Sequence, residues 1–419
     1  MHLATSEALW SAGGPRFRPL RLMAPLAAVL AAAAWPALAA EWDFSGSLQL
    51  ETRVFPSEPA HAGQKDATLS PSVAVEPELI VDTEAGADRF TLKPFLRLDA
   101  DDGNRSHGDL REANWLHFGD GYDLVVGLDK VFWGVAESRH LVDIVNQADL
   151  VEDIDQEDKL GQPMVQLQVG TDWGVFRGFL MPVFRERTFP DDDARFRGPL
   201  PIAGDAAYQS DAGEFHPDLA LRWTRTFGGF DVGISHFRGT SREPRLVPTL
   251  RDGRTELLPT YDLIDQTGVD LQYTTGAWLW KVEGIGRAGQ GDYFVASVAG
   301  FEYTLYQVAE TDADLGLLLE YLYDGREESG DAPPTPFQND VFVGARVTLN
   351  DEDDTTFLAG AVADAEDRSV SLSLEASRRI GNDLKVELEA RLFPDVEPGN
   401  ALYGIRRDNV VTLRLSRFF

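Results

Sequence analysis

The sequence contains no cysteine among its 419 residues. Disulfide bonds, thiolate metal sites and cysteine nucleophiles are therefore excluded. Basic residues are also scarce, since 38 Lys and Arg stand against 69 Asp and Glu, for a formal net charge of -31. This balance argues against a nucleic-acid partner, because phosphate binding needs a basic surface. A disordered acidic chain does not fit either, because the sequence carries nine Trp, ten Tyr and twenty-four Phe.

The first forty residues have the organisation of a targeting segment. Three arginines between residues 16 and 21 precede an apolar run over 23–34, and the small triplet Ala37-Leu38-Ala39 follows. This order predicts a signal peptide over residues 1–39, with cleavage after Ala39 or Ala40; a retained N-terminal anchor is the alternative. No later segment has eighteen consecutive apolar residues, so a membrane location would require a barrel of strands.

The mature chain, residues 40–419, alternates apolar and polar residues with a period of two. In residues 384–392 the leucines, Val386 and Ala390 fall on one face, and four charged side chains fall on the other. A helix could not separate these groups, whereas a strand does so automatically. We predict eighteen strands, with sixteen as the alternative, near 42–54, 70–82, 88–100, 109–119, 122–134, 163–170, 174–184, 218–227, 229–239, 261–275, 278–289, 293–307, 313–324, 340–350, 355–365, 369–380, 384–393 and 409–418.

The predicted connections alternate between short and long along the chain. Short links rich in Gly, Asp, Asn and Thr, such as 120–121 and 276–277, suit tight turns. Long links follow at 55–69, 135–162, 185–217, 240–260, 325–339 and 394–408. A transmembrane barrel has short periplasmic turns and longer external loops. The pattern predicts an all-β fold, namely an antiparallel up-and-down transmembrane β-barrel.

The C-terminal strand supports this prediction. Val411, Leu413 and Leu415 alternate with polar residues, and the chain stops at Phe419. Here the sequence resembles Gram-negative outer-membrane proteins, whose terminal aromatic residue is read by the barrel assembly machinery. Arg417 departs from the ideal pattern and is expected at the periplasmic rim. The stretch from Phe132 to His140 is similar to uncharacterised porin-like outer-membrane proteins and implies no defined function.

The face opposite the apolar one should line the lumen. Its basic residues are Lys93, Arg97, Arg222, Lys281, Arg346, Lys385, Arg391 and Arg414. Its acids include Glu283, Glu320, Glu375, Glu387 and Glu389. An eighteen-stranded barrel is wide enough to hold water unless a loop fills it. Most of these charges need only be solvated or paired, so we expect any function to be collective.

The third external link, 135–162, is both acidic and apolar. Its acids are Asp143, Asp149, Glu152, Asp153, Asp155, Glu157 and Asp158, and its apolar residues recur at roughly helical spacing. We expect this loop to fold inward, as the third loop does in general porins, and to narrow the pore. Its acids would then face the basic wall and create a transverse field that selects solutes by charge. The alternative is a helical loop packed on the outer rim.

The sequence gives little support for a catalytic site or a metal site. Ser138 and His140 lie two residues apart in a loop, and no G-x-S-x-G motif is present. The acids after residue 152 have calcium-loop spacing, but Asp158 stands where glycine is required and Met164 where the bidentate acid belongs. Loose calcium binding stays open. The other histidines, including His107 and His117, show no ligand spacing. We predict no enzyme, no cofactor and no defined metal site.

We therefore interpret the protein as an outer-membrane, porin-like channel for passive diffusion of small hydrophilic solutes or ions. Its expected partners are outer-membrane lipid, the barrel assembly machinery and the solutes themselves, with a homotrimer as a further expectation. One alternative is an exopolysaccharide exporter similar to the eighteen-stranded alginate-export barrels, although a mixed lumen fits a polyanion poorly. The others are an outer-membrane enzyme and a plugged structural barrel.

Overall fold

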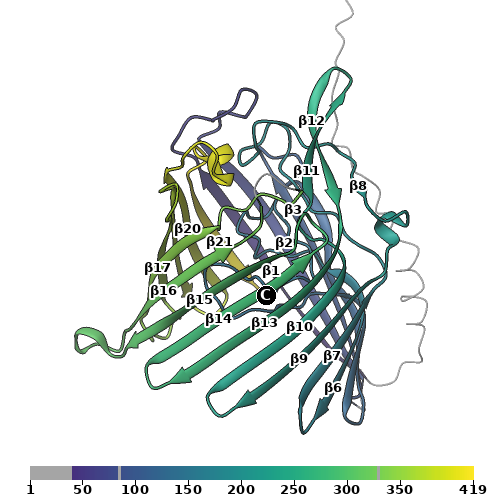
Figure 1. Ribbon diagram of the computed structural model, residues 1–419. Coiled ribbons are helices and arrows are strands. Elements are labelled where there is room, and N and C mark those ends of the chain that lie inside the picture. The colour runs from purple at the N-terminus through teal and green to yellow at the C-terminus, as the bar shows by residue number, and fades with distance from the viewer. Residues whose placement is uncertain (1–39, 84–85, 328–330) are drawn as a thin grey trace, which may run out of the picture. The chain divides into compact units, whose positions relative to one another are not determined.

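The computed structural model describes residues 40–83, 86–327 and 331–419. The predicted signal peptide lies outside these ranges and stays a prediction. Within them, eighteen antiparallel strands form one sheet. The sheet closes because β1 (Ala40–Val54) pairs with β21 (Val410–Phe418) from Ser47↔Phe418 to Val54↔Val411. The predicted all-β transmembrane barrel is confirmed, with eighteen strands rather than sixteen (Figure 1).

Each barrel strand pairs with its neighbours in chain order. The other sixteen are β2 (Leu69–Thr83), β3 (Asp88–Asp99), β4 (His107–Phe118), β5 (Tyr122–Asp129), β6 (Gln162–Thr171), β7 (Gly174–Met181), β9 (Asp218–Phe227), β10 (Phe230–Thr240), β13 (Leu263–Thr275), β14 (Trp278–Ala288), β15 (Phe294–Leu305), β16 (Asp314–Asp324), β17 (Asn339–Thr348), β18 (Thr356–Asp364), β19 (Val370–Ile380) and β20 (Leu384–Asp395). Outside the barrel lie the strands β8 (Ala207–Tyr208), β11 (Arg245–Arg251) and β12 (Arg254–Tyr261) and the 3₁₀ turns η1 (Gly213–Phe215), η2 (Val308–Glu310) and η3 (Ala401–Ile405). Over the described ranges, we find no helix with the length and apolar character needed to cross a bilayer.

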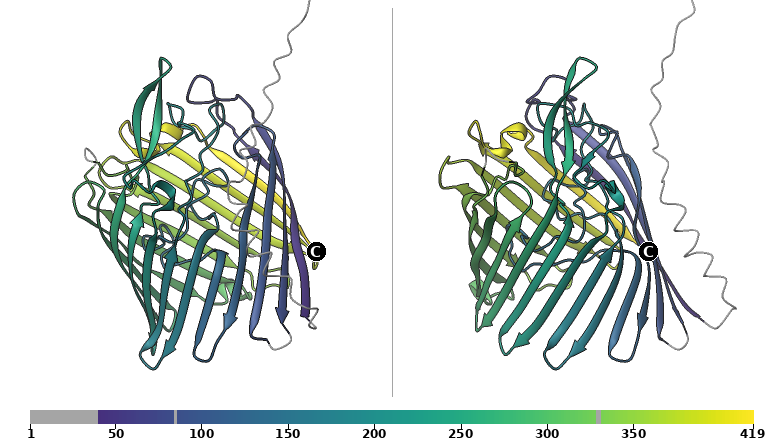
Figure 2. Two further views of the ribbon diagram at one scale, coloured as in Figure 1. Left: turned by 90° about the vertical axis from the view of Figure 1, so that its right-hand side faces the viewer. Right: turned by 45° about the vertical axis from the view of Figure 1, so that its right-hand side comes forward.

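Short and long connections lie at opposite ends of the barrel, as the alternation predicts. In Figure 1 the tight turns between β6 and β7, β9 and β10, and β13 and β14 lie at the lower end. The long connections and the β11–β12 hairpin gather at the upper end, as both views in Figure 2 also show. The sorted loop lengths identify the lower end as periplasmic and the upper end as external.

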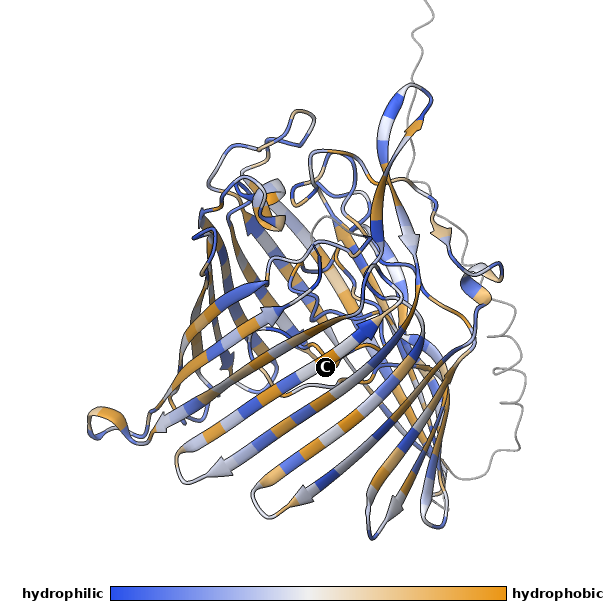
Figure 3. Cartoon of the chain, viewed as in Figure 1, coloured by the Kyte–Doolittle hydropathy of each residue, from blue (hydrophilic) through white to orange (hydrophobic). Residues whose placement is uncertain are grey.

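The strands carry an apolar row toward the outside. Along β16, Leu317 and Leu319 are 43% and 40% exposed, which is typical of side chains that would contact lipid. Figure 3 shows the resulting alternation of orange and blue bands along the lower strands. Near the short-turn end, Trp278 and Trp280 are exposed and stack with ring centroids 5.4 Å apart. Such aromatic residues suit the membrane interface.

One predicted strand boundary is wrong, and one predicted long connection contains strands of its own. Residues 122–134 were expected to be one strand, but β5 ends at Asp129. The chain leaves the wall there because the Val131 amide donates to the Asn146 side chain, 3.0 Å away, rather than to a neighbouring strand. The predicted loop 240–260 contains the β11–β12 hairpin instead. Its turn uses positive φ angles at Asp252 and Gly253, a combination that Asp-Gly sequences favour.

Candidate functional site

The candidate site is the inner face of the barrel together with L3, the connection of residues 130–161 between β5 and β6. L3 contains no helix, so its helical spacing was misleading; it consists of turns, bends and the isolated bridges Ala148↔Lys159 and Asp149↔Thr188. Its side chains and backbone contact β1, β3, β4, β13, β14, β16, β17 and β20. In the ring, β4 and β16 lie opposite each other, with eight strands between them in either direction. One connection therefore touches both walls.

The first half of L3 is held by two glutamates of the wall. Glu283 on β14 accepts hydrogen bonds from the backbone amides of Val135 (2.6 Å), Ala136 (2.9 Å) and Val142 (3.2 Å). Glu320 on β16 accepts the amides of residues 137 and 138, both at 2.8 Å, and the Ser138 hydroxyl at 2.6 Å. Both glutamates were predicted only as lumen charges. Each instead satisfies buried backbone donors of an irregular segment, which would otherwise cost free energy.

The same half of L3 is packed in apolar side chains. Trp133, Leu141, Val142, Ile144 and Val145 are buried in one cluster with inward residues of the wall. The wall contributes Met164, Phe179, Met181, Ala220, Phe237, Ile264, Ile285, Phe294, Ala296, Val298, Leu318, Leu322 and Phe342. The inner face of β6 to β17 is therefore substantially apolar, whereas the sequence was expected to give a polar inner face throughout.

The second half of L3 is held by ion pairs. Asp149 lies 2.6 Å from Arg111 of β4, and Glu152 lies 2.8 Å from Arg97 of β3. Arg391 of β20 pairs with Asp153 at 3.2 Å and also with Asp155. These four acids face basic wall residues and contact them directly. The transverse field itself stays a prediction.

The remaining predicted residues divide into four groups. Lys281 and Arg346 reach Glu137 of L3, at 3.5 and 2.6 Å. Arg222 pairs with Asp270 at 2.8 Å and lies over the Trp133 ring of L3, 5.0 Å from its centroid. Three basic residues pair with the wall and not with L3: Lys93 with Glu76, Lys385 with Glu387, and Arg414 with Glu51. Asp143 pairs within L3, with Lys159 at 3.0 Å.

Two acids of L3 stay uncompensated. Over the described residues, neither Glu157 nor Asp158 has an ion pair or a side-chain hydrogen bond, and both are exposed. Partial desolvation and the Glu375 carboxylate of β19 raise the pKa of Glu157. Glu375 is itself exposed and has no ion pair within the described ranges. Its own cross-strand neighbour is Glu389.

Sequence reasoning missed a second charged cluster at the external end. Glu243, in the connection after β10, lies 2.7 Å from Arg287 and 3.2 Å from Arg326, and Arg139 of L3 approaches within 4.0 Å. Burial alone would raise the pKa of Glu243, but the surrounding arginines hold it well below its usual range. Asp324 pairs with Arg139 and Arg326 at 3.0 and 2.8 Å. These contacts tie L3 to the external loops, and no local sequence motif predicts them.

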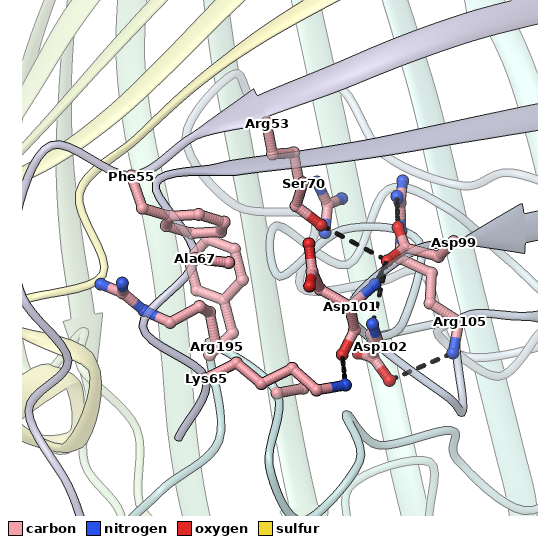
Figure 4. Close-up of a pocket in the computed structure, with 12 residues that line it drawn as sticks. Arg53, Phe55, Lys65, Ala67, Ser70, Asp99, Asp101, Asp102, Arg105 and Arg195 are labelled. Atoms are coloured by element: carbon pink, nitrogen blue, oxygen red, sulfur yellow. Dashed lines mark hydrogen bonds and ion pairs between the residues drawn. The ribbon is translucent and has the colours of Figure 1, made fainter. Parts of the chain in front are cut away.

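A small pocket at the external end is drawn in Figure 4. Phe55 and Phe196 form one side, with ring centroids 5.6 Å apart. Its four cations are already paired: Arg195 with Asp408 at 2.6 Å, Arg105 with Asp99 at 2.7 Å, Arg53 with Glu51 at 3.4 Å, and Lys65 with Asp193 at 3.3 Å. We therefore assign the pocket to the packing of the external loops.

Comparisons with known proteins define the class of the barrel. No protein-family model and no curated protein matches the sequence. Among solved structures, a BenF-like porin from Pseudomonas fluorescens Pf-5 is similar, with a TM-score of 0.52, 10% identity, and coverage of 91% of this chain and 98% of that chain. Wzi of Escherichia coli, described as a carbohydrate-binding β-barrel involved in group 1 capsule assembly, has a TM-score of 0.51, 10% identity, and coverage of 88% and 83%.

At such identities the similarity shows the fold alone. Together with the closed eighteen-stranded sheet and its apolar outer row, it identifies the chain as an outer-membrane β-barrel protein of the porin-like class. Its place is the Gram-negative outer membrane. The comparisons define this class but no family within it.

Proposed function

We propose that the protein is a passive channel for small hydrophilic solutes, narrowed by L3 and selective for cations. The contacts of L3 with opposite walls support a constriction, because a segment tied to β4 and to β16 must cross the space between them. The apolar cluster fills the side toward β6–β17. Water and solutes would pass on the other side, along β19 and β20.

The lining of that side supports a polar path. Two small residues with inward register, Ser371 and Ser373, lie along β19. The inner face of β18 is covered instead, because the Phe342 ring lies over Gly360 and Leu358 and Val362 pack against the apolar cluster. Glu375 follows on the same face of β19, and its carboxylate is one cause of the raised pKa of Glu157 in L3. Because most other loop acids are neutralised by arginine, these two carboxylates and Asp158 carry the uncompensated charge. A pore lined by one sign of charge concentrates ions of the opposite sign.

The test is the reversal potential of the refolded barrel in a planar bilayer under a salt gradient. We expect cation preference for the native protein and a several-fold lower cation-to-anion permeability ratio for the double variant Glu157→Gln/Glu375→Gln. Glu310→Gln is the matched control, since Glu310 is exposed in the connection between β15 and β16. Anion preference in the native protein, or an unchanged ratio in the double variant, would contradict the proposal.

A second candidate is a barrel closed by L3 that binds carbohydrate at its external end. The similarity to Wzi and the dense packing of L3 favour it. A folded native barrel that gives no conductance steps but binds oligosaccharide would select this candidate. We propose no catalytic role, because the Ser138 hydroxyl donates to Glu320 rather than to a histidine. Recognition of Phe419 by the assembly machinery and a homotrimer stay predictions.

A further inference from the structure

His107, the first residue of β4, has one ring nitrogen engaged and one free. Its Nδ1 lies 3.0 Å from the carbonyl oxygen of Arg105. A carbonyl can only accept a hydrogen bond, so Nδ1 carries the hydrogen. In the neutral ring, Nε2 then presents a bare lone pair. This atom is buried and has no hydrogen-bond partner in the described part of the chain.

The free nitrogen faces two carboxylates of L3. Nε2 lies 3.8 Å from Asp149 Oδ2 and 3.8 Å from Glu152 Oε1, and the three atoms lie within 4.8 Å of one another. Asp149 and Glu152 are 0% and 5% exposed. A nitrogen lone pair beside two buried carboxylate oxygens is repulsive unless a proton on Nε2 or a metal cation lies between them. A point equidistant from the three atoms is roughly 2.1–2.5 Å from each, close to the Zn–N and Zn–O distances of about 2.0–2.2 Å.

Other contacts hold the three groups in place. Thr188 donates to Asp149 Oδ1 at 2.7 Å, and Arg111 to Oδ2 at 2.6 Å. Arg97 donates to both oxygens of Glu152, at 2.9 and 3.1 Å. Outer partners of this kind orient metal ligands. The two guanidinium charges also disfavour a cation bound by charge alone, so a metal with strong affinity for imidazole is preferred over Ca²⁺ or Mg²⁺.

We propose that His107, Asp149 and Glu152 form a binding site for Zn²⁺ or a similar imidazole-preferring divalent cation. The ion joins the start of β4 to the acidic half of L3 and completes the attachment of that half to the wall. A second group, Asp153, Asp155 and Glu389, lacks this property, since it has no imidazole and Arg391 already lies between its acids. The proposal goes beyond the channel function, because metal binding does not depend on conduction.

The test uses the tag-free, refolded protein in detergent. Titration calorimetry with Zn²⁺ should show one saturable site per chain, and Co²⁺ should give a visible absorption band that Zn²⁺ removes. His107→Asn should weaken Zn²⁺ binding at least tenfold. His117→Asn is the matched control, because His117 lies on the same strand and its Nδ1 also lies beside a carboxylate, 2.8 Å from Asp88. It should bind as the native protein does.

Glu152→Gln provides a second variant that keeps the shape of the loop and should also weaken binding. Heat-modifiable migration in gels establishes that each variant is folded. No saturable binding by the native protein, or equal affinity in the native protein and His107→Asn, would overturn the proposal. Because calorimetry needs no pore, these outcomes are independent of whether the barrel conducts.

Discussion

Replacing Glu283 by alanine should release the first half of L3 from the wall. The substitution removes the acceptors of three backbone amides, two of them at 2.6 and 2.9 Å. A hydrogen bond to a charged group contributes about 1.5–3 kcal/mol, so the two short bonds together give roughly 3–6 kcal/mol. Since about 1.4 kcal/mol is a factor of ten, the population of the released loop should rise by about a hundredfold or more.

Limited trypsin digestion of the refolded barrel measures this release, because L3 contains Arg139 and Lys159. The native loop should resist cleavage, whereas Glu283→Ala should be cut at these sites while the strands stay protected. Single-channel current should become larger and noisier. Glu302→Ala is the matched control, because Glu302 lies on the adjacent strand β15 and faces Arg346 at 3.6 Å rather than the L3 backbone. A Glu283→Ala loop as resistant as the native one would refute the anchoring role.

Three further predictions address the membrane face, the pH response and assembly. Leu374→Arg places a cation on the outer face of β19 and should lower the free energy of unfolding in lipid by about 2–4 kcal/mol, whereas the adjacent inward Ser373→Arg should cost far less in the same urea titration. Partial desolvation and the nearby Glu152 carboxylate raise the pKa of Asp158, which has no ion pair within the described ranges, to about 6. A carboxyl with a raised pKa is neutral at lower pH, so cation selectivity should grow as the pH rises through about 6, and a pH-independent reversal potential would contradict this. Deleting Phe419 should reduce the amount of barrel in cell envelopes but not refolding of the purified chain; equal envelope levels would argue against an assembly signal.

The strands and their order were readable from the sequence because lipid imposes a strict rule. Every second residue of a membrane strand must tolerate hydrocarbon, so the period of two is maintained along strands such as 384–392. The sorting of loop lengths followed from the two ends of a barrel. Both features are local in sequence, and the eighteen predicted strands correspond to the eighteen barrel strands.

The inner face was less predictable, because some of its side chains face water and others are covered by L3. Leu318 and Leu322 point inward and are buried at 3% and 1% exposure, beneath L3. The run of leucines around them is apolar on both faces, which is the signal of a strand buried on two sides. The Asp252-Gly253 turn was likewise a readable signal of the β11–β12 hairpin within the predicted external loop.

The contacts of L3 could not be derived from the sequence. Glu283 is 147 residues away in the sequence from Ala136, whose backbone amide donates a hydrogen bond to it. His107 and Glu152 approach each other only because L3 returns to the start of β4. No rule on the sequence spacing of ligands applies to residues this far apart in the chain, so His107 seemed isolated in the sequence. The acids of L3 were recognised as a group, but which of them stay free depends on where each arginine lies in the closed ring.

The most direct test of the channel is single-channel recording from the refolded native protein in a planar bilayer, compared with a variant whose residues 149–158 are replaced by a Gly-Ser segment of equal length. We predict stable, small, cation-selective steps for the native barrel and larger, less selective steps for the variant. A folded native barrel without steps, or equal conductance in the two proteins, would contradict a channel narrowed by L3.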